Sequence, residues 1–252
     1  MKIFVCIKQV ISRESPLRVN EEANWIRSRN AEYELNESDS YALEAGLRLK
    51  EMYGGKVVVC SAGPERVSQL LREGLARGAD SAIHVLSDDL ETGDGFAIAE
   101  ALACGLCDER PDLVLTGLQS DDRGFASTGV ALAELLRIPH STIIVDIEIS
   151  DNVVRVKREL EGGWFQWISM PLPALLTIQS GINQLRYATL KGIMAAKKKQ
   201  IRTVAGQAVT MRHRVLSLYA PEKTKQTTMI EGTPEEVSRE LVRLLREEAG
   251  AI

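Results

Sequence analysis

The 252-residue sequence lacks a long apolar segment, a secretion signal and an excess of basic residues. Its net charge of −4 argues against general nucleic-acid binding. No stretch approaches the ~20 consecutive apolar residues that a membrane-spanning helix needs. The apolar run after Met1 is too short for a signal peptide, and no small-residue cleavage site follows it. The sequence therefore predicts a cytoplasmic protein, or an organelle-matrix protein if a transit peptide was removed.

Recognisable catalytic and metal-binding motifs are also scarce. Cys6 and Cys60 lie in apolar runs and are expected to be small core residues. Cys104 and Cys107 have the spacing of a redox or zinc half-site, but they lie in an Ala-rich helical pattern and no second pair completes a zinc site. The sequence has no GxxxxGK[ST], GxGxxG or GxSxG motif. The residues thus indicate no catalytic apparatus.

The most informative stretch spans residues 113–136. An apolar run, expected to be a buried parallel strand, stops at Gly117, and a polar loop leads to an apolar-periodic helix near Ser127. Such a junction can bind an anion, because the first N–H groups of the helix and the positive end of its dipole face the loop. Thr128 adds a hydroxyl and Arg123 a positive charge. The residues alone leave two interpretations open, a phosphate-binding loop and an ordinary strand-to-helix turn.

Four strand-then-helix units are expected in the first half of the chain. The expected strands are 2–7, 56–60, 81–86 and 113–116, and the expected helices are 41–50, 65–77, 93–107 and 127–136. This alternation predicts an α/β fold with a mostly parallel, doubly wound sheet. Ligands of such sheets bind at the carboxyl ends of the strands. The loops near Cys6, Asn36, Ala62 and Gly117 should therefore meet at one edge.

The second half of the chain has a different pattern. Runs 142–149, 153–159, 164–169 and 174–178 are expected to be strands that extend the sheet in antiparallel fashion. A short helix is expected over 187–199. Residues 200–233 have little helical period, and we expect an extended arm that lies on a partner subunit. A capped amphipathic helix from Thr233 to about Glu248 should follow. We expect a nucleotide-binding domain over residues 1–200 and an arm with a helix over 201–252.

Several motifs in order resemble the electron transfer flavoprotein β subunit. The run VKRELEGG at 156–163, with the residues that follow it to Thr177, is similar to the family's signature. The segment GINQLRYATL at 181–190 looks like the family's docking segment, and TMIEGT at 228–233 also matches. The ends of the central loop, QS at 119–120 and ASTG at 126–129, resemble the bacterial, dehydrogenase-linked branch. The resemblance covers nearly the whole chain.

This resemblance implies a fold like that of the adenine-nucleotide α-hydrolases and a heterodimer with an α subunit that holds most of an FAD site. The flavin would take electrons from a dehydrogenase of the acyl-CoA dehydrogenase type or similar, as in fatty acid β-oxidation. It would pass them to a quinone oxidoreductase or another acceptor, and this chain would supply no catalytic residue. In most members the β subunit also binds a structural AMP. The positions that carry over to AMP contacts are Cys6, Asn36, Glu37, Ser38, Asp39, Ala62, Gly117, Leu118, Gln119, Ser120, Asp121, Asp122, Arg123, Gly124, Phe125, Ala126, Ser127 and Thr128.

Three further residues gain an expected role from the resemblance. Leu190 matches the family's anchoring leucine, which enters an apolar pocket of the partner dehydrogenase and can contribute ~2 kcal/mol or more. Without the family, a leucine of the helix core would be the preferred interpretation of Leu190. Glu159 is a candidate charged contact in the same complex. Arg13 stands where members often carry an aromatic residue near the flavin, and its charge would favour anionic reduced forms.

Two alternative functions stay open at this point. Electron-bifurcating relatives hold a second FAD in the pocket that holds AMP in other members, although the loop's likeness to the AMP-binding branch favours AMP. The sequence departs from the family pattern at residues 122–124. Family members often have a cluster of acidic residues there, whereas this sequence has only the first of them, Asp122. A free-standing nucleotide-sensing module would share the α/β topology. Such a module needs neither a docking segment nor an arm, which argues against it.

Overall fold

The computed structural model describes residues 1–22, 24–27, 31–221 and 227–251. The chain forms two compact units, Met1–Leu218 and Tyr219–Ile252. Positions 222–226 of the predicted arm, and residue 252, lie outside the described residues. No helix of the described residues is both long enough and apolar enough to cross a membrane.

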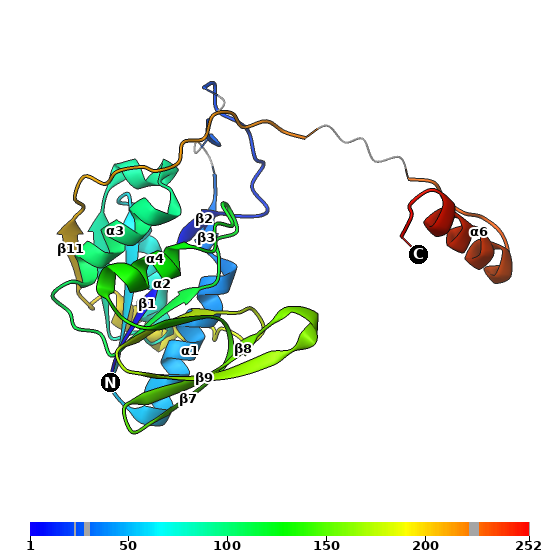
Figure 1. The fold of residues 1–252 in the computed structure, drawn as a ribbon. Helices are drawn as coiled ribbons and strands as arrows, with labels where there is room; N and C mark the ends of the chain where they lie inside the picture. The colour runs from blue at the N-terminus through cyan, green and yellow to red at the C-terminus, as the bar shows by residue number, and fades with distance from the viewer. Residues whose placement is uncertain (23, 28–30, 222–226, 252) are drawn as a thin grey trace. The chain divides into compact units, whose positions relative to one another are not determined.

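The first unit is built on a nine-stranded sheet with the order β11-β5-β4-β1-β6-β10-β7-β8-β9 (Figure 1). The strands are β1 (Lys2–Cys6), β4 (Lys56–Gly63), β5 (Ser81–Leu86), β6 (Leu113–Gly117), β7 (His140–Ser150), β8 (Val153–Glu159), β9 (Phe165–Pro171), β10 (Ala174–Ile178) and β11 (Ile201–Ala205). Strands β2 (Gln9–Ile11) and β3 (Tyr33–Leu35) form a separate antiparallel pair. The predicted α/β sheet with an antiparallel extension is confirmed, since β7, β8 and β9 are antiparallel neighbours.

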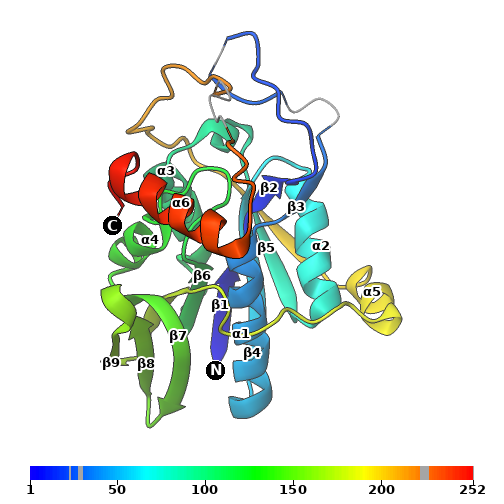
Figure 2. The ribbon, with the colours of Figure 1, turned by 90° about the vertical axis from the view of Figure 1, so that its right-hand side faces the viewer.

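Helices cover both faces of this sheet, as Figure 2 shows. They are α1 (Glu37–Tyr53), α2 (Val67–Arg77), α3 (Gly95–Leu106) and α4 (Thr128–Leu136). The short helix α5 (Leu190–Ala196) packs on α2 instead, and η1 (Asp88–Thr92) and η2 (Glu161–Gly163) are short 3-10 turns. Strand β1 supplies both cores, because its side chains alternate between the faces. Ile3 and Val5 pack with α1 and α2, whereas Phe4 packs with α3 and α4. The doubly wound arrangement is thus confirmed.

Two strands differ from the sequence-based expectation. β10 was expected in the antiparallel extension, but it lies between β6 and β7 and is parallel to both. All five of its residues are buried, which is typical of an interior parallel strand rather than of a half-exposed hairpin. β11 lies where the arm was expected to begin, and it pairs in parallel with β5 at the sheet edge.

The helices begin and end within a few residues of the expected bounds, with two exceptions. α1 begins at Glu37, so Ser38 and Asp39 belong to its first turn rather than to the loop before it. α5 spans only Leu190–Ala196 of the expected 187–199. In the second unit, α6 (Pro234–Glu247) is capped by Thr233, whose side chain and that of Glu236 form a capping box. The predicted C-terminal helix is confirmed, and none of its residues is buried.

Candidate functional site

A cavity of about 410 Å³ lies at the carboxyl ends of β1, β4 and β6. Its wall includes Cys6 at the end of β1, Asn36 before α1, Ala62 in β4 and the loop that follows Gly117. The four loops that were expected to meet therefore do meet. This is the edge at which doubly wound sheets bind their ligands.

The carboxylate of Asp39 joins the ends of two neighbouring strands at this cavity. Its Oδ2 accepts the backbone N–H of Lys8 at 2.7 Å, and its Oδ1 accepts that of Gly117 at 2.9 Å. Gly117 must be a glycine here, because a Cβ would lie 2.4 Å from Asp39 Oδ1 and 2.4 Å from Ser38 Oγ. Burial raises the pKa of Asp39 to about 7, although both backbone N–H groups favour its charged form.

The start of α1 also holds the polar loop between β6 and α4. The Asn36 side chain donates to the carbonyl of Gln119 at 3.0 Å and accepts the N–H of Asp121 at 2.9 Å. Ser38 Oγ donates to the same Gln119 carbonyl. Asn36 is almost fully buried, so its polar atoms need these partners. Asn36 and Ser38 thus fix the shape of the loop rather than cap α1 with their side chains.

Positive side chains surround the cavity, and each one has a partner. Lys8 Nζ lies 2.6 Å from Asp122 Oδ1, and burial lowers the pKa of this lysine. The Arg123 guanidinium stacks on the Trp25 ring at 4.1 Å and donates to the Glu91 carbonyl at 3.0 Å. Burial lowers the pKa of Arg123 as well.

Two helix N-termini adjoin at this edge, but only one is capped by a side chain. In α3 the buried Asp94 accepts the N–H groups of Phe96 and Ala97. In α4 the N-cap residue Ser127 makes no side-chain capping hydrogen bond. A Cβ built on Gly95 would lie 2.8 Å from Ser127 Oγ, so the two termini lie close together. The first turn of α4 therefore keeps the N–H groups that suit an anion.

Asp94 also fixes the segment that follows β11. Its Oδ2 accepts the N–H groups of Arg212 at 2.5 Å and His213 at 2.7 Å. Burial alone would raise the pKa of Asp94, but the backbone N–H groups of Ala97 and, after it, of His213, Arg212 and Phe96 hold this pKa below its usual value. The His213 ring lies 6.3 Å from that of Phe125, a cavity residue.

Most of the residues predicted to contact a nucleotide line the cavity. They are Cys6, Asn36, Asp39, Ala62, Gly117, Leu118, Gln119, Ser120, Asp121, Asp122, Arg123, Phe125, Ala126 and Thr128, and Arg13 lines it too. Glu37, Ser38, Gly124 and Ser127 adjoin it in the chain and are not part of the described lining. Arg13 pairs with Glu37 and lies 3.4 Å from Asp121.

Sequence reasoning missed several residues of the cavity wall. Lys8, Gln9, Trp25, Tyr33 and Arg66 all line it. Lys8 and Arg66 follow strands whose ends were already expected at this edge, so their position in the chain was an available signal. Trp25 belongs to the segment between β2 and β3, and no periodicity indicates where that segment lies. Gln9 Oε1 and Arg66 Nε are buried and find no hydrogen-bond partner among the described residues.

The two residues predicted to meet a partner protein lie away from this cavity. Leu190 begins α5, and 83% of its surface is exposed. Glu159 ends β8 and accepts a hydrogen bond from Gln179 at 3.2 Å. In the described part of the chain, no three His, Cys, Asp or Glu side chains are grouped so that they could hold a metal ion.

Comparisons with known proteins point to one family. Residues 24–209 match the model of the electron transfer flavoprotein domain. The chain is 38% identical to the electron transfer flavoprotein subunit beta of Methylophilus methylotrophus, and the match covers all of both chains. It is 34% identical to the protein of the same name from Bacillus subtilis and 36% identical to that from Bradyrhizobium diazoefficiens, again over all of both chains.

Proposed function

This chain belongs to the family of electron transfer flavoprotein β subunits, and from that premise we propose that it is one half of a heterodimeric electron carrier. Its α partner holds most of an FAD site. The complex acts in the cytoplasm, takes electrons from a dehydrogenase of the acyl-CoA type or similar, and passes them to a quinone oxidoreductase or another acceptor. This chain contributes no catalytic residue, so its own residues bind, position and dock.

The cavity at the carboxyl edge holds AMP in this proposal. Its volume of about 410 Å³ lies in the lower part of the roughly 300–1,000 Å³ range of small-molecule sites, which suits a mononucleotide better than a flavin dinucleotide. The observation that carries the assignment is the N-terminus of α4, which opens at the cavity without a side-chain cap, beside Lys8 and Arg123. The phosphate would bind there. Cys6 and Ala62 would line the adenine and the ribose.

Several predicted contacts would act on the nucleotide through the loop between β6 and α4. Asn36 and Ser38 hold Gln119 and Asp121 in place, and Asp39 holds Gly117. A nucleotide or water also offers partners for polar groups in the wall, such as Gln9 Oε1. The residues present therefore fit AMP.

FAD, when bound, supplies the electron-accepting and electron-donating chemistry of the complex. In this proposal Arg13 lies near the flavin and lends it positive charge, moderated by its acidic neighbours Glu37 and Asp121. An unchanged flavin potential in Arg13→Ala would contradict this role. The described helix α6 has an apolar stripe with no buried residue, and it docks on the α subunit.

Leu190 and Glu159 face the donor dehydrogenase in this proposal. Leu190 is among the most exposed leucines of the described residues, and Tyr187, Ile193 and Met194 near it are exposed as well. A single aliphatic side chain that becomes buried at the centre of an interface can dominate its affinity. A small interface suits a carrier that must release its partner quickly.

The test uses the heterodimer with its α subunit, loaded with FAD and mixed with an acyl-CoA dehydrogenase that its acyl-CoA substrate has reduced. We expect saturable reduction of the carrier flavin. Leu190→Ala should raise the apparent KM for the carrier roughly 30-fold, the equivalent of ~2 kcal/mol. Leu135→Ala, which removes a partly exposed leucine of α4, is the matched control and should leave KM unchanged. A heterodimer that takes up no flavin, or an unaltered KM in Leu190→Ala, would overturn the proposal.

A further inference from the structure

The chain between β10 and β11 crosses two helices and exposes an unusual number of apolar side chains. Tyr187 is 90% exposed, Leu190 83%, Met194 63% and Ile193 42%. Residues 181–189 form no helix or strand, and α5 has only seven residues. A short helix and a loop do not hold a fixed conformation by themselves. Contacts with the rest of the unit must therefore fix the surface that carries Leu190.

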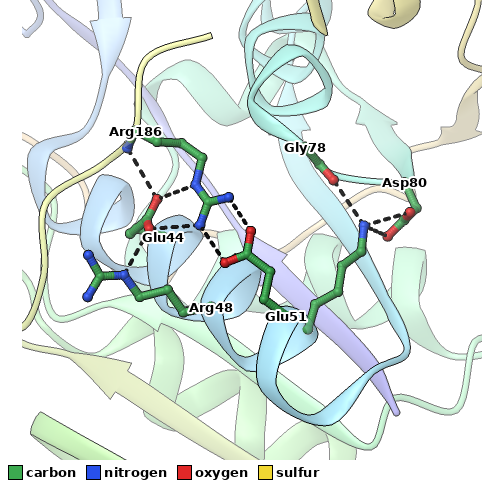
Figure 3. Close-up of polar contacts among 7 residues, drawn as sticks. Glu44, Arg48, Glu51, Gly78, Asp80 and Arg186 are labelled. Atoms are coloured by element: carbon green, nitrogen blue, oxygen red, sulfur yellow. Dashed lines mark hydrogen bonds and ion pairs between the residues drawn. The ribbon is translucent and has the colours of Figure 1, made fainter. Parts of the chain in front are cut away.

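The first of these contacts is a fork of ionic hydrogen bonds from Arg186 to α1 (Figure 3). Arg186 Nε and one terminal nitrogen each donate to a different oxygen of Glu44, both at 2.9 Å. Its backbone N–H donates to Glu44 Oε2 at 3.2 Å. Two further bonds reach Glu51, about two turns along the same helix. Two parallel hydrogen bonds from a guanidinium fix the orientation of the arginine relative to the carboxylate as well as its distance, whereas a single ion pair fixes only the distance.

Glu44 is suited to hold this residue firmly, since its side chain is only 3% exposed. Burial raises the pKa of Glu44, but hydrogen bonds from Arg186 and Arg48 outweigh burial and keep it below its usual value. The carboxylate is therefore charged, buried and fully partnered. Arg48 reaches Glu44 Oε1 at 2.9 Å from the same helix and does not contact residues 181–190 in any described hydrogen bond.

The second contact fixes the far end of α5 on α2. Arg72 donates to the carbonyls of Ala196 at 2.7 Å and Lys199 at 2.5 Å, as a cap at the carboxyl end of the helix. Lys199 Nζ donates to the Ala79 carbonyl at 2.5 Å. Gly192 lies against α2 so closely that a Cβ would come within 2.2 Å of the Ala76 carbonyl oxygen.

The two supporting helices are in turn joined to each other. Lys50 Nζ, near the end of α1, lies 2.8 Å from both carboxylate oxygens of Asp80 and 3.2 Å from the carbonyl of Gly78, in the turn after α2 (Figure 3). The apolar surface of α5 therefore lies between two contacts on a connected frame. At the Arg186 end, Asn183 Nδ2 also donates to the Tyr41 carbonyl of α1 at 3.0 Å. Arg186 supplies all the ionic hydrogen bonds described for residues 181–190.

We propose that Arg186, bound to Glu44 and Glu51, is a positioning residue that holds residues 181–190 in the conformation presenting Leu190 to the donor dehydrogenase. The inference rests on the proposed function of Leu190. Arg186 acts before docking, because ordering the segment in the free carrier removes an entropic cost from the encounter. Its side chain is one-third exposed and need not touch the partner at all.

The test compares Arg186→Ala with Arg48→Ala in the FAD-loaded heterodimer. Each variant removes one arginine from Glu44, but only the first removes side-chain hydrogen bonds between residues 181–190 and α1. If the presenting conformation falls to ~10% of molecules, the apparent affinity falls about 10-fold. We expect Arg186→Ala to raise the KM for the carrier by that factor with little change in kcat, with the acyl-CoA dehydrogenase as donor. Arg48→Ala should leave KM within about 2-fold.

Hydrogen–deuterium exchange supplies a readout that needs no donor. Arg186→Ala should speed exchange of the amides of residues 181–190 and leave those of α1 and the sheet unchanged. Arg48→Ala should not change exchange in residues 181–190. Glu51→Gln, at an exposed position, removes the charge and one acceptor oxygen of the outer bonds, and its amide oxygen can still accept one of them. It should give a smaller change in the same direction, which keeps the test valid if Arg186→Ala folds poorly.

Three outcomes would overturn the inference. The first is unchanged exchange of residues 181–190 in both Arg186→Ala and Glu51→Gln. The second is an equal rise of KM in Arg48→Ala and Arg186→Ala, which would indicate a general effect of Glu44. The third is a raised KM in Leu190→Ala together with an unchanged KM in Arg186→Ala. If Leu190→Ala itself has no effect, the docking function fails first, and the exchange result still decides whether Arg186 orders the segment.

Discussion

Asp39 shows how one side chain can serve two strands at the residue scale. Its two oxygens accept backbone N–H groups at the ends of β1 and β6, the neighbouring strands that frame the cavity. The sequence presents Asp39 only as one of several polar residues before a helix. This role depends on hydrogen bonds to Lys8 and Gly117, which are separated from Asp39 by 31 and 78 positions in the sequence. No local sequence pattern predicts such distant contacts.

The raised pKa of Asp39 predicts a specific pH dependence of stability. Burial lifts the pKa from 3.8 to about 7, so between these values the folded chain holds a proton that the unfolded chain has lost. The free energy of unfolding should therefore fall as pH rises through this range, by up to ~1.4 kcal/mol per pH unit from this group. Asp39→Asn does not titrate and lacks this contribution.

Urea unfolding of both proteins at several pH values measures the effect. The difference in unfolding free energy, wild type minus Asp39→Asn, should decrease from about pH 4 to about pH 7 and be constant above it. Other carboxyl groups contribute equally to both proteins and cancel in the difference. A difference that does not change with pH would show that Asp39 keeps an ordinary pKa.

At the scale of the element, β6 ends in a tightly packed glycine, Gly117, and the loop between β6 and α4 contains an exposed glycine, Gly124. Gly117 leaves no room for a Cβ against Asp39 and Ser38. Gly124 has a φ of +62°, and no atom lies within 4 Å of the place where its Cβ would be. Substitutions at these two positions can therefore distinguish the effect of packing on stability from the effect of backbone conformation.

Replacing each glycine by alanine should give different losses of stability. Gly117→Ala should cost roughly 1–3 kcal/mol through overpacking and displace the Asp39 carboxylate. Gly124→Ala should cost only about 1 kcal/mol, the penalty of a left-handed backbone conformation. Urea unfolding of the two variants checks the order. Equal losses would mean that the strand end has space that the contacts of Gly117 do not show.

The sequence predicted which segments are helices or strands more successfully than which strands are neighbours in the sheet. Apolar runs and caps located the strands and helices of the first half, because these signals are local. The neighbours of β10 and β11 could not be derived, since strand order depends on contacts between distant residues. β10 carries the uninterrupted apolar run of an interior strand, and this signal outweighs the short turn before it that indicated a hairpin.

The candidate site could be predicted in outline for a similar reason. The rule that ligands bind at the carboxyl ends of parallel strands identified the loops that meet. It did not identify Trp25, because that residue comes from the long connection between β2 and β3 and reaches the cavity by stacking with Arg123. The contact between Arg186 and Glu44 joins residues that are 142 positions apart, so it could not be predicted from the sequence either.

At the scale of the whole molecule, three parts have separate tasks in the proposed function. The carboxyl edge of the sheet would bind a nucleotide that stabilises the fold, since a ligand of the folded state alone adds to its stability. In the same proposal, the surface of α5 meets the electron donor. The unit that contains α6 would dock on the α subunit, which would hold most of the flavin.

In the proposed function, the cavity of this chain holds AMP and not a second flavin. The most direct measurement is to purify the heterodimer with its α subunit, denature it, and count the released FAD and AMP by chromatography. We expect one FAD and one AMP for each heterodimer. Two FAD and no AMP would contradict it, because the cavity would then belong to a carrier of the electron-bifurcating kind.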